Sequence, residues 1–508
     1  MRINPLLSAF VLFAMAGLAL SAPAQNSTLI SGGTVIDGTG TKRRMADVRI
    51  VGDTITAVGK LRARYGEKVI DATGLMVAPG FIDAHSHADG GLLTDPDAET
   101  QIRQGITTSV VGQDGGSHFP LASWFAEVEA KHVALNIASF VGHGTVRTEV
   151  TGKEYKRVTT PEEQRRMADL VTQEMQAGGL GLSSGLEYDP GFYSTTDELI
   201  ACAKAAAKYH GIYISHVRDE GDKAFESFQE LITIAEKGGL PAQISHIKLD
   251  TSPVWNKAPD VLTMMRDAHK RGLDISADVY PYTYWQSTII VLIPTRDWSD
   301  RKAWETGLAE VGGAEHVRLT TYTPDAAWSG KTIAEIAAMT GRDAIGIVQE
   351  VVQKTHGAGA TGSESVVVTA MTESDLGKFI AAPGIMFCTD GSLRPSHPRG
   401  AGSFPRILGE YVRTQHLLTF EEAIRKATSL PAARFGFQRR GRIARGMKAD
   451  IVLFDPAAVQ DKATVAAPAA APVGLPTVLV NGIPVLENGR ITGAHPGAVL
   501  RHVSAPQN

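Results

Sequence analysis

Four histidines and two aspartates stand where short apolar runs of the sequence give way to polar or glycine residues. The first run, GFIDAHSH, ends in a His-x-His pair, His85 and His87. Alternate residues of a strand point the same way, so both imidazoles can reach one ion. Four later runs end in Asp114, His216, His246 and Asp390. Imidazoles and carboxylates placed in this way are typical of a site for one or two divalent ions of the zinc type.

Some of these residues also fit a purely structural role. Asp114 lies in Gln-Asp-Gly-Gly, which is favourable turn chemistry, and Asp390 precedes a glycine. His143, in VGHGT, also ends an apolar run. A contact to a metal ligand, a contact to a substrate and a structural role all stay open for this histidine.

Eight apolar runs alternate with helix-like stretches between residues 79 and 435. The runs are GFIDAHSH, GITTSVVGQDGG, ALNIASFVGHG, GLGLSSGLEY, GIYISHVRDE, PAQISHIKLD, LDISADVYPY and GIMFCTDGS. Helix-like stretches include Pro161–Ala177, Thr196–Tyr209 and Lys223–Lys237. This alternation predicts an α/β fold, a (β/α)8 TIM-like barrel, whose catalytic groups sit at the carboxyl ends of the strands.

Three other segments complete the predicted organisation. About a hundred residues separate the seventh and eighth runs, which predicts an insertion over the active site near residues 283–383. Residues 25–78 and 436–508 are both rich in short strand patterns and turns. We expect them to form one small β-sandwich domain, with two unrelated β appendages as the alternative. Residues 457–473, rich in Ala and Pro, are expected to form a surface loop.

The amino-terminal residues predict export. Arg2 precedes an apolar stretch, Leu6–Leu20, and Ala22-Pro23-Ala24 matches a small-x-small cleavage pattern. Residues 1–24 are therefore expected to be a signal peptide, with an uncleaved membrane anchor as the alternative. We expect a secreted, periplasmic protein with no stable membrane anchor.

Composition limits the remaining possibilities. Cys202 and Cys388 are the only two cysteines, which excludes a disulfide scaffold and leaves open whether this pair is bonded. The net charge is −4 and no basic run is present, so nothing indicates a nucleic-acid partner. The oligomeric state is not indicated by the sequence.

The motifs resemble those of a known family. The Gly-Phe-Ile-Asp-x-His-x-His opening and Asp390 resemble the amidohydrolase superfamily, and more narrowly the D-aminoacylase (N-acyl-D-amino-acid deacylase) family. The resemblance covers nearly everything after residue 24. Its most specific segments are GLSSGLEYDPG (181–191), HVRDEGD (216–222), ISHIK (244–248), DVYPY (278–282) and HPR followed by FPRILG (397–409). It implies a barrel with a small β-sandwich built from both termini.

The resemblance also implies a metal site in two halves. One half is His85, His87 and Asp390, and the other is His216 and His246. The family usually has a metal-binding Cys in a Gly-Asn-Cys-Gly turn, whereas this chain has Asp114 at that position. A carboxylate can bind or bridge two ions as a hard oxygen ligand.

The substrate contacts that the resemblance implies are Arg399, Lys248 and a tyrosine of DVYPY, which would hold an α-carboxylate. We take Tyr282 for the tyrosine, with Tyr280 as the alternative. Arg suits this role because its planar fork meets a carboxylate at two points. The aromatic residues Tyr284 and Trp285 depart from the small residues expected there and are predicted to reshape the pocket.

The resemblance thus implies hydrolysis of a linear amide, with N-acyl-D-amino acids as substrates and one or two Zn²⁺ ions as cofactor. A metal-bound hydroxide would attack the amide carbon, and Asp390 would act as general base and return the proton to the leaving nitrogen. Two alternatives stay within hydrolases: a dipeptidase, and a cyclic-amide hydrolase of the dihydroorotase or hydantoinase kind. An isomerase or deaminase and a periplasmic binding protein are the remaining alternatives. The acyl group, the side chain and the D or L preference stay open.

Overall fold

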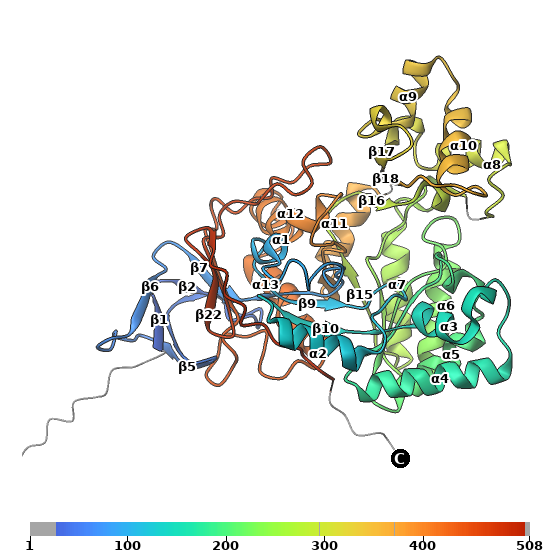
Figure 1. Cartoon of the computed structure of the whole chain (residues 1–508). Helices are drawn as coiled ribbons and strands as arrows, with labels where there is room; N and C mark the ends of the chain where they lie inside the picture. The colour runs from blue at the N-terminus through green and yellow to red at the C-terminus, as the bar shows by residue number, and fades with distance from the viewer. Residues whose placement is uncertain (1–26, 294, 370, 503–508) are drawn as a thin grey trace, which may run out of the picture.

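The computed structural model describes residues 27–293, 295–369 and 371–502 (Figure 1). The predicted signal peptide, residues 1–24, lies outside the described residues. Among the described residues, no helix combines the length and the apolar character that crossing a membrane requires.

Nine short parallel strands form the centre of the molecule, and they coincide with the eight apolar runs because the third run is split into β10 and β11. One sheet has the order β10-β9-β8 and the other has the order β11-β12-β13-β14-β15-β19. The strands are β8 (Phe81–Asp83), β9 (Ile106–Val111), β10 (Asn136–Ser139), β11 (Val141–Gly142), β12 (Gly181–Gly185), β13 (Ile212–His216), β14 (Ala242–Ile244), β15 (Ile275–Val279) and β19 (Ile385–Phe387). Strands this short, and nearly all buried, are typical of a sheet covered on both faces.

Two connections link these sheets at their edges. Only Phe140 separates β10 from β11, so one sheet continues into the other along the chain. At the other edges, the amide of Ala84 donates to the carbonyl of Phe387 at 3.3 Å, and the amide of Asp390 donates to the carbonyl of His85 at 2.8 Å. The segments that follow β8 and β19 therefore lie side by side, and the carboxyl ends of all these strands face the same region.

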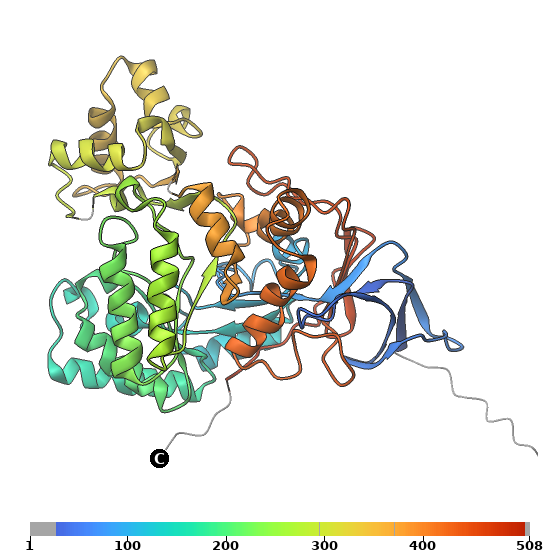
Figure 2. The same cartoon turned by 180° about the vertical axis from the view of Figure 1, so that it is seen from behind.

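Helices cover the outer faces of the parallel strands (Figure 2). They include α4 (Pro161–Gln176), α5 (Thr196–Ala207), α6 (Ala224–Gly238) and α7 (Ala258–Lys270). The helix α4 begins at a capping box, in which Thr160 and Glu163 each accept from the other's backbone amide. The predicted helices at 161–177, 196–209 and 223–237 are confirmed to within two residues at each end.

The two terminal segments share one sheet. A four-stranded sheet, β5-β4-β1-β6, is built from β1 (Ser27–Ser31), β4 (Asp47–Val51), β5 (Thr54–Gly59) and β6 (Lys68–Asp71). A seven-stranded sheet has the order β23-β22-β21-β20-β7-β2-β3, in which β7 (Met76–Pro79) pairs antiparallel with β20 (Ile451–Phe454). Its other strands are β2 (Thr34–Val35), β3 (Arg44–Met45), β21 (Thr477–Val480), β22 (Ile483–Glu487) and β23 (Arg490–Ile491). One apolar cluster joins both sheets and includes Ile50, Val77 and Leu453. Residues from the two ends of the chain therefore pack in a common core.

The long connection between β15 and β19 has its own sheet and its own core. Its strands are β16 (Tyr284–Ser287), β17 (Val317–Tyr322) and β18 (Glu364–Thr369), paired antiparallel in the order β16-β18-β17. The helices α8 (Arg301–Glu310), α9 (Ile333–Thr340) and α10 (Ala344–Thr355) pack on them around Trp304 and Val348. This part of the chain forms a separate lobe beside the parallel strands in Figures 1 and 2.

Candidate active site

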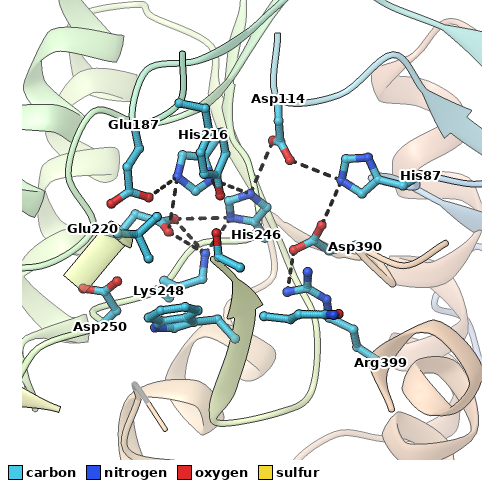
Figure 3. A pocket seen from close by; sticks show the side chains of 15 residues that line it. His87, Asp114, Glu187, His216, Glu220, His246, Lys248, Asp250, Asp390 and Arg399 are labelled. Carbon is cyan, nitrogen blue, oxygen red and sulfur yellow. Dashed lines mark hydrogen bonds and ion pairs between the residues drawn. The ribbon is translucent and has the colours of Figure 1, made fainter. Parts of the chain in front are cut away.

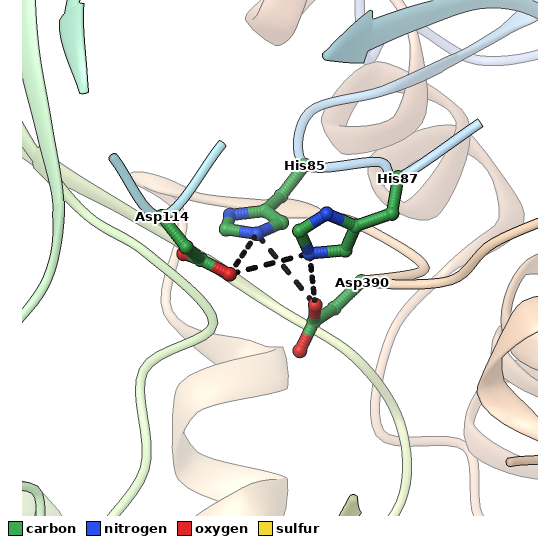
Figure 4. Close-up of side chains that lie close together, drawn as sticks. All are labelled: His85, His87, Asp114 and Asp390. Atoms are coloured by element: carbon green, nitrogen blue, oxygen red, sulfur yellow. Dashed lines mark hydrogen bonds and ion pairs between the residues drawn. The ribbon is translucent and has the colours of Figure 1, made fainter. Parts of the chain in front are cut away.

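Side chains from three strand ends form a first group of ligand atoms (Figure 4). The Nε2 atoms of His85 and His87 lie 3.4 and 3.2 Å from Oδ2 of Asp114. The same two nitrogens lie 3.6 and 3.1 Å from Oδ1 of Asp390. Two imidazoles and two carboxylates therefore converge on one point, as in a site for a divalent cation.

A second group adjoins the first and shares Asp114 with it. His216 Nδ1 lies 3.0 Å from His246 Nε2, and that Nε2 atom lies 3.4 Å from Oδ1 of Asp114. Each carboxylate oxygen of Asp114 thus faces a different group of histidines. Asp114 is also a turn residue, because its φ of 53° is left-handed between Gly112 and Gly115. The turn and the ligand interpretations of this residue are therefore compatible.

Three of these residues have strained backbones. Asp114, His246 and Asp390 have φ values of 53°, 33° and 47°. Non-glycine residues rarely adopt this region, and such strain is concentrated at functional sites because the surrounding structure must hold it. Two of these backbones are held by neighbouring segments: the amide of His246 donates to Oδ1 of the buried Asp278 at 2.8 Å, and the amide of Asp390 donates to the carbonyl of His85 at 2.8 Å.

The donor set fits a cation, because its charges and its unpaired atoms are those that a metal ion would satisfy. Both ring nitrogens of His85 and Oδ1 of Asp114 are buried without a hydrogen-bond partner among the described residues. Burial alone would lower the pKa of His87, but hydrogen bonds and charge from Asp114 and Asp390 outweigh it and hold that pKa well above 6.5. The carboxylates therefore stabilise positive charge at this point. Neutral imidazole nitrogens and carboxylate oxygens are ligands of the zinc type.

Two glutamates that the sequence analysis did not single out support the histidines. Oε2 of Glu187 lies 2.8 Å from Nε2 of His216, which leaves Nδ1 of that ring to face the ligand group. Oε1 of Glu220 lies 3.3 Å from Nδ1 of His246, and the pKa of Glu220 is lowered, since the charge of Lys248 and the histidines outweighs burial. Both glutamates lie within four residues of the end of a parallel strand, β12 or β13; this position is a signal in the sequence, but glutamates at the surface share it.

Lys248 and Arg399 approach the ligand groups from below in Figure 3. Arg399 Nη1 lies 2.7 Å from Oδ2 of Asp390, and its Nε atom is buried without a hydrogen-bond partner among the described residues. Nζ of Lys248 lies 2.7 Å from Oε2 of Glu220. The ring of Tyr280 lies near both cations, 4.8 Å from the Arg399 guanidinium carbon and 5.8 Å from the Lys248 ammonium.

Tyr282, the tyrosine we expected at the substrate, lies elsewhere. Its hydroxyl donates to Oδ2 of Asp461 at 3.3 Å, and the Arg406 guanidinium lies 5.0 Å from its ring centre. The strand β15 ends at Val279, so the chain has left the sheet before it reaches this residue. Tyr282 does not line the cavity beside the ligand groups. Of the two alternatives, Tyr280 is the one that the structure brings to Lys248 and Arg399.

A cavity of about 270 Å³ opens in front of the two groups. Its walls include Glu187, Lys248, Asp250 and Arg399 (Figure 3). Trp285, from the long connection, also lines it. Tyr284, the other aromatic residue predicted to reshape the pocket, does not line this cavity and packs instead on His397 with ring centres 4.8 Å apart.

Three further residues have structural positions. His143 is fully buried, and its Nε2 lies 2.8 Å from Oε1 of Glu198, which also pairs with Arg147. This histidine does not line the cavity, so the structural role is the one the geometry favours. Cys202 and Cys388 are both buried and free, so they are not bonded to each other.

Comparison with known proteins agrees with this geometry. The sequence matches the amidohydrolase family over residues 68–486. It is 35% identical to a D-aminoacylase of Alcaligenes xylosoxydans xylosoxydans over 503 residues, which cover 94% of this chain and 98% of the relative.

Solved structures with a similar fold give the same result. One is an N-acyl-D-glutamate deacylase from Bordetella bronchiseptica, complexed with zinc and a phosphonate that mimics the tetrahedral intermediate. It matches with a TM-score of 0.83 and 33% identity, covering 93% of this chain and 99% of that chain. A D-aminoacylase whose binuclear metal centre was studied matches with a TM-score of 0.82 and 32% identity, with the same coverage.

Proposed function

The chain belongs to the amidohydrolase family, and we propose that it hydrolyses the amide bond of N-acyl-D-amino acids with the help of divalent metal ions. One observation carries the proposal: two groups of ligand atoms meet at Asp114, directly beside the buried guanidinium of Arg399. The ligand groups suit a cation that activates water, and the guanidinium suits the carboxylate of an amino acid.

We assign the ligand candidates to two metal ions. His85, His87, Asp390 and one oxygen of Asp114 would hold one ion, and His216, His246 and the other oxygen of Asp114 would hold a second. Zinc is the ion we propose, since imidazole nitrogens and carboxylate oxygens are its usual ligands. A bound zinc ion supplies a Lewis acid and lowers the pKa of water towards about 7.

Asp390 is the group placed to move the proton. Its Oδ1 faces the histidines of the first group, while its Oδ2 is held by Arg399 at 2.7 Å. The guanidinium and the nearby imidazoles outweigh burial and lower the pKa of Asp390, so the carboxylate is ionised and accepts a proton from the attacking water. It then donates that proton to the leaving nitrogen, which completes the cleavage.

Arg399 and Lys248 are the groups placed to hold the α-carboxylate of the substrate. Arg399 keeps an unpaired, buried Nε–H while it pairs with Asp390, so it has a donor left for a second carboxylate. Lys248 is fixed by Glu220, which orients its ammonium and balances its charge. The two cations flank Tyr280, which excludes water from one side of them.

We infer the following domain organisation. The parallel strands would close into a (β/α)8 barrel over residues 79–435, because backbone hydrogen bonds join the ends of β8 and β19. Residues 283–383 would be an insertion, and residues 25–78 and 436–508 a β-sandwich, in line with the pairing of β7 and β20. We also propose that residues 1–24 direct the chain to the periplasm.

The test is a substrate screen on the purified, zinc-loaded protein with a chelated sample as control. N-acetyl and N-formyl amino acids in D and L forms are compared with dipeptides and cyclic ureides, and free amine is measured. We expect turnover of N-acyl-D-amino acids that chelation abolishes and zinc restores. Turnover of dipeptides or cyclic amides alone would assign the same ligands to a different hydrolase, and turnover that survives chelation would contradict the metal assignment.

A further inference from the structure

A second cavity of about 420 Å³ continues from the first beneath the long connection. The two cavities share four lining residues: Glu187, Asp250, Trp285 and Val291. The far wall of the second cavity comes from α8 and the segment before it, and includes Leu292 and Gly307. A ligand bound beside Lys248 can therefore extend past Asp250 into this space.

The second cavity is strongly acidic. Six carboxylates line it, against two lysines: Glu187, Asp219, Asp222, Asp250, Asp300, Glu310, Lys223 and Lys302. Most of these carboxylates already have partners. Asp300 caps α8 by accepting from the amides of Lys302 and Ala303, and Asp219 accepts from the amides of Gly221 and Lys223.

Asp250 differs from its neighbours, because its carboxylate has no ion pair or hydrogen bond to another described residue. Only its backbone is engaged, through an amide that donates to the carbonyl of Glu220 at 2.9 Å. Burial and the negative charges of Glu220 and Glu187 outweigh the ammonium of Lys248 and raise the pKa of Asp250 well above 3.8. A carboxylate in this position is stabilised by a cation supplied from outside the protein.

Trp285 lies at the junction of the two cavities, where it lines both. An indole is the best aromatic surface for an ammonium or guanidinium group, and its flanks also favour the methylene groups that carry such a cation. The junction therefore offers an apolar aromatic wall next to an unpaired carboxylate.

We propose that this acidic side cavity binds the cationic side chain of the substrate, so that the favoured substrates are N-acyl-D-amino acids with an ammonium or guanidinium side chain. The inference rests on the proposed function and names its substrate class. Lys248 and Asp250 both line the first cavity, and Asp250 also lines the second. One amino acid of the lysine or arginine type can therefore place its α-carboxylate at Lys248 and its cation at Asp250.

The first measurement compares kcat/KM for N-acetyl-D-lysine and N-acetyl-D-arginine with that for N-acetyl-D-norleucine, which has a similar length and no charge. We expect the cationic substrates to be preferred by about 10- to 100-fold, the range for one hydrogen-bonded charge pair. Gly-D-norleucine is included because its cation lies on the acyl half instead of the side chain.

The second measurement uses variants. Asp250→Asn is expected to lower the preference for the cationic substrate by about 10- to 100-fold, measured as kcat/KM for N-acetyl-D-lysine divided by kcat/KM for N-acetyl-D-norleucine. Asp250→Glu, which keeps the charge, should preserve the sign of the preference. Asp267→Asn is the matched control: this aspartate is exposed on α7 and pairs with Lys270, so the ratio should not change. Competitive inhibition of the wild type by D-lysine and D-norleucine gives a readout that needs no variant to fold.

Each outcome has a definite meaning. An unchanged ratio in Asp250→Asn, or equal inhibition by D-lysine and D-norleucine, would overturn the side-cavity proposal while turnover of N-acetyl-D-norleucine upholds the proposed function. Preference for Gly-D-norleucine over every N-acetyl substrate would place the cation on the acyl half and overturn the side-chain assignment. No turnover of any N-acyl-D-amino acid would overturn the proposed function itself, and the inference with it.

Discussion

At the scale of single residues, Asp114 determines how the two ligand groups relate. A thiolate offers one sulfur atom, whereas this carboxylate offers two oxygens that already face different histidines. Oxygen is also a harder donor than sulfur, so the site should tolerate ions such as Mn²⁺ better than a thiolate site does.

Removing this carboxylate tests the arrangement directly. We expect Asp114→Ala, loaded with zinc and dialysed, to hold about one metal ion fewer per chain than the wild type, because both groups lose an oxygen ligand. Elemental analysis measures the metal content independently of activity. Asp267→Asn is the control for the loss of one carboxylate at the surface. Metal content equal to that of the wild type would exclude Asp114 as a ligand.

Asp390 gives a second prediction at this scale. Asp390→Asn keeps the size of the side chain but removes the proton acceptor, so kcat should fall by about 10³-fold. The melting temperature should stay close to that of the wild type, and metal content is measured in the same samples because Asp390 is also a ligand candidate. If the variant retains a large part of the turnover, another group is the base.

The residues that the sequence identified and those it missed differ in one physical respect. The metal-ligand candidates directly follow apolar runs. Parallel strands bring their carboxyl ends together, whatever the exact positions of the helices between them. Glu187 and Glu220 lie farther along the loops, where a glutamate at the site and one at the surface have the same local pattern. The choice between Tyr280 and Tyr282 depended on Asp461, a partner 179 residues away that no local pattern indicates.

At the scale of elements, a buried ionic network ties α3 (His143–Thr151) to α5. Glu198 of α5 is fully buried and contacts His143 and Arg147 of α3. Burial alone would raise the pKa of Glu198, but hydrogen bonds and charge from these two partners outweigh it and lower the pKa from 4.5 to about 2. A group with a depressed pKa stabilises the fold above its unfolded pKa and loses that contribution as pH falls towards the folded value.

Glu198→Gln should therefore be less stable than the wild type at neutral pH by about 3–5 kcal/mol, since it leaves Arg147 buried without its counter-charge. The difference should narrow as pH falls from about 4.5 to about 2, where the wild type loses its own carboxylate. Urea unfolding at a series of pH values measures it. Glu127→Gln, at an exposed position of α2 (Leu121–Lys131), is the control. A difference that is independent of pH would contradict the assignment.

The elements themselves were predictable to different degrees. The eight apolar runs all became strands because a strand buried on both faces leaves a short, nearly continuous apolar segment. The three-stranded sheet of the long connection was not predicted, because its pairing joins distant residues, such as Tyr284 with Thr369. Register of that kind is set by tertiary packing around Trp304, not by local sequence.

At the scale of the whole molecule, the ligand candidates come from five strand ends, β8, β9, β13, β14 and β19. Bound metal would therefore join segments from across the parallel strands and stabilise the folded state only. Chelation should lower the melting temperature and restored zinc should raise it. The corresponding gain in the free energy of unfolding is up to about 4 kcal/mol when free zinc exceeds Kd a thousandfold. Calorimetry with a zinc-saturated chelator as control measures the effect. An unchanged melting temperature would mean that the ligands are held equally well without metal.

The pairing of β7 with β20 has a consequence for how the chain is made. The amino-terminal strands leave the ribosome early, whereas β20, which pairs with β7, follows all of the parallel strands along the chain. Until then one edge of β7 is unpaired, and the strand is apolar because all its residues are buried in the folded protein. Such edges associate with other chains. Synthesis of β20, and not completion of the parallel strands, therefore sets the moment at which this sheet can close, and loss of β20 would leave an aggregation-prone edge.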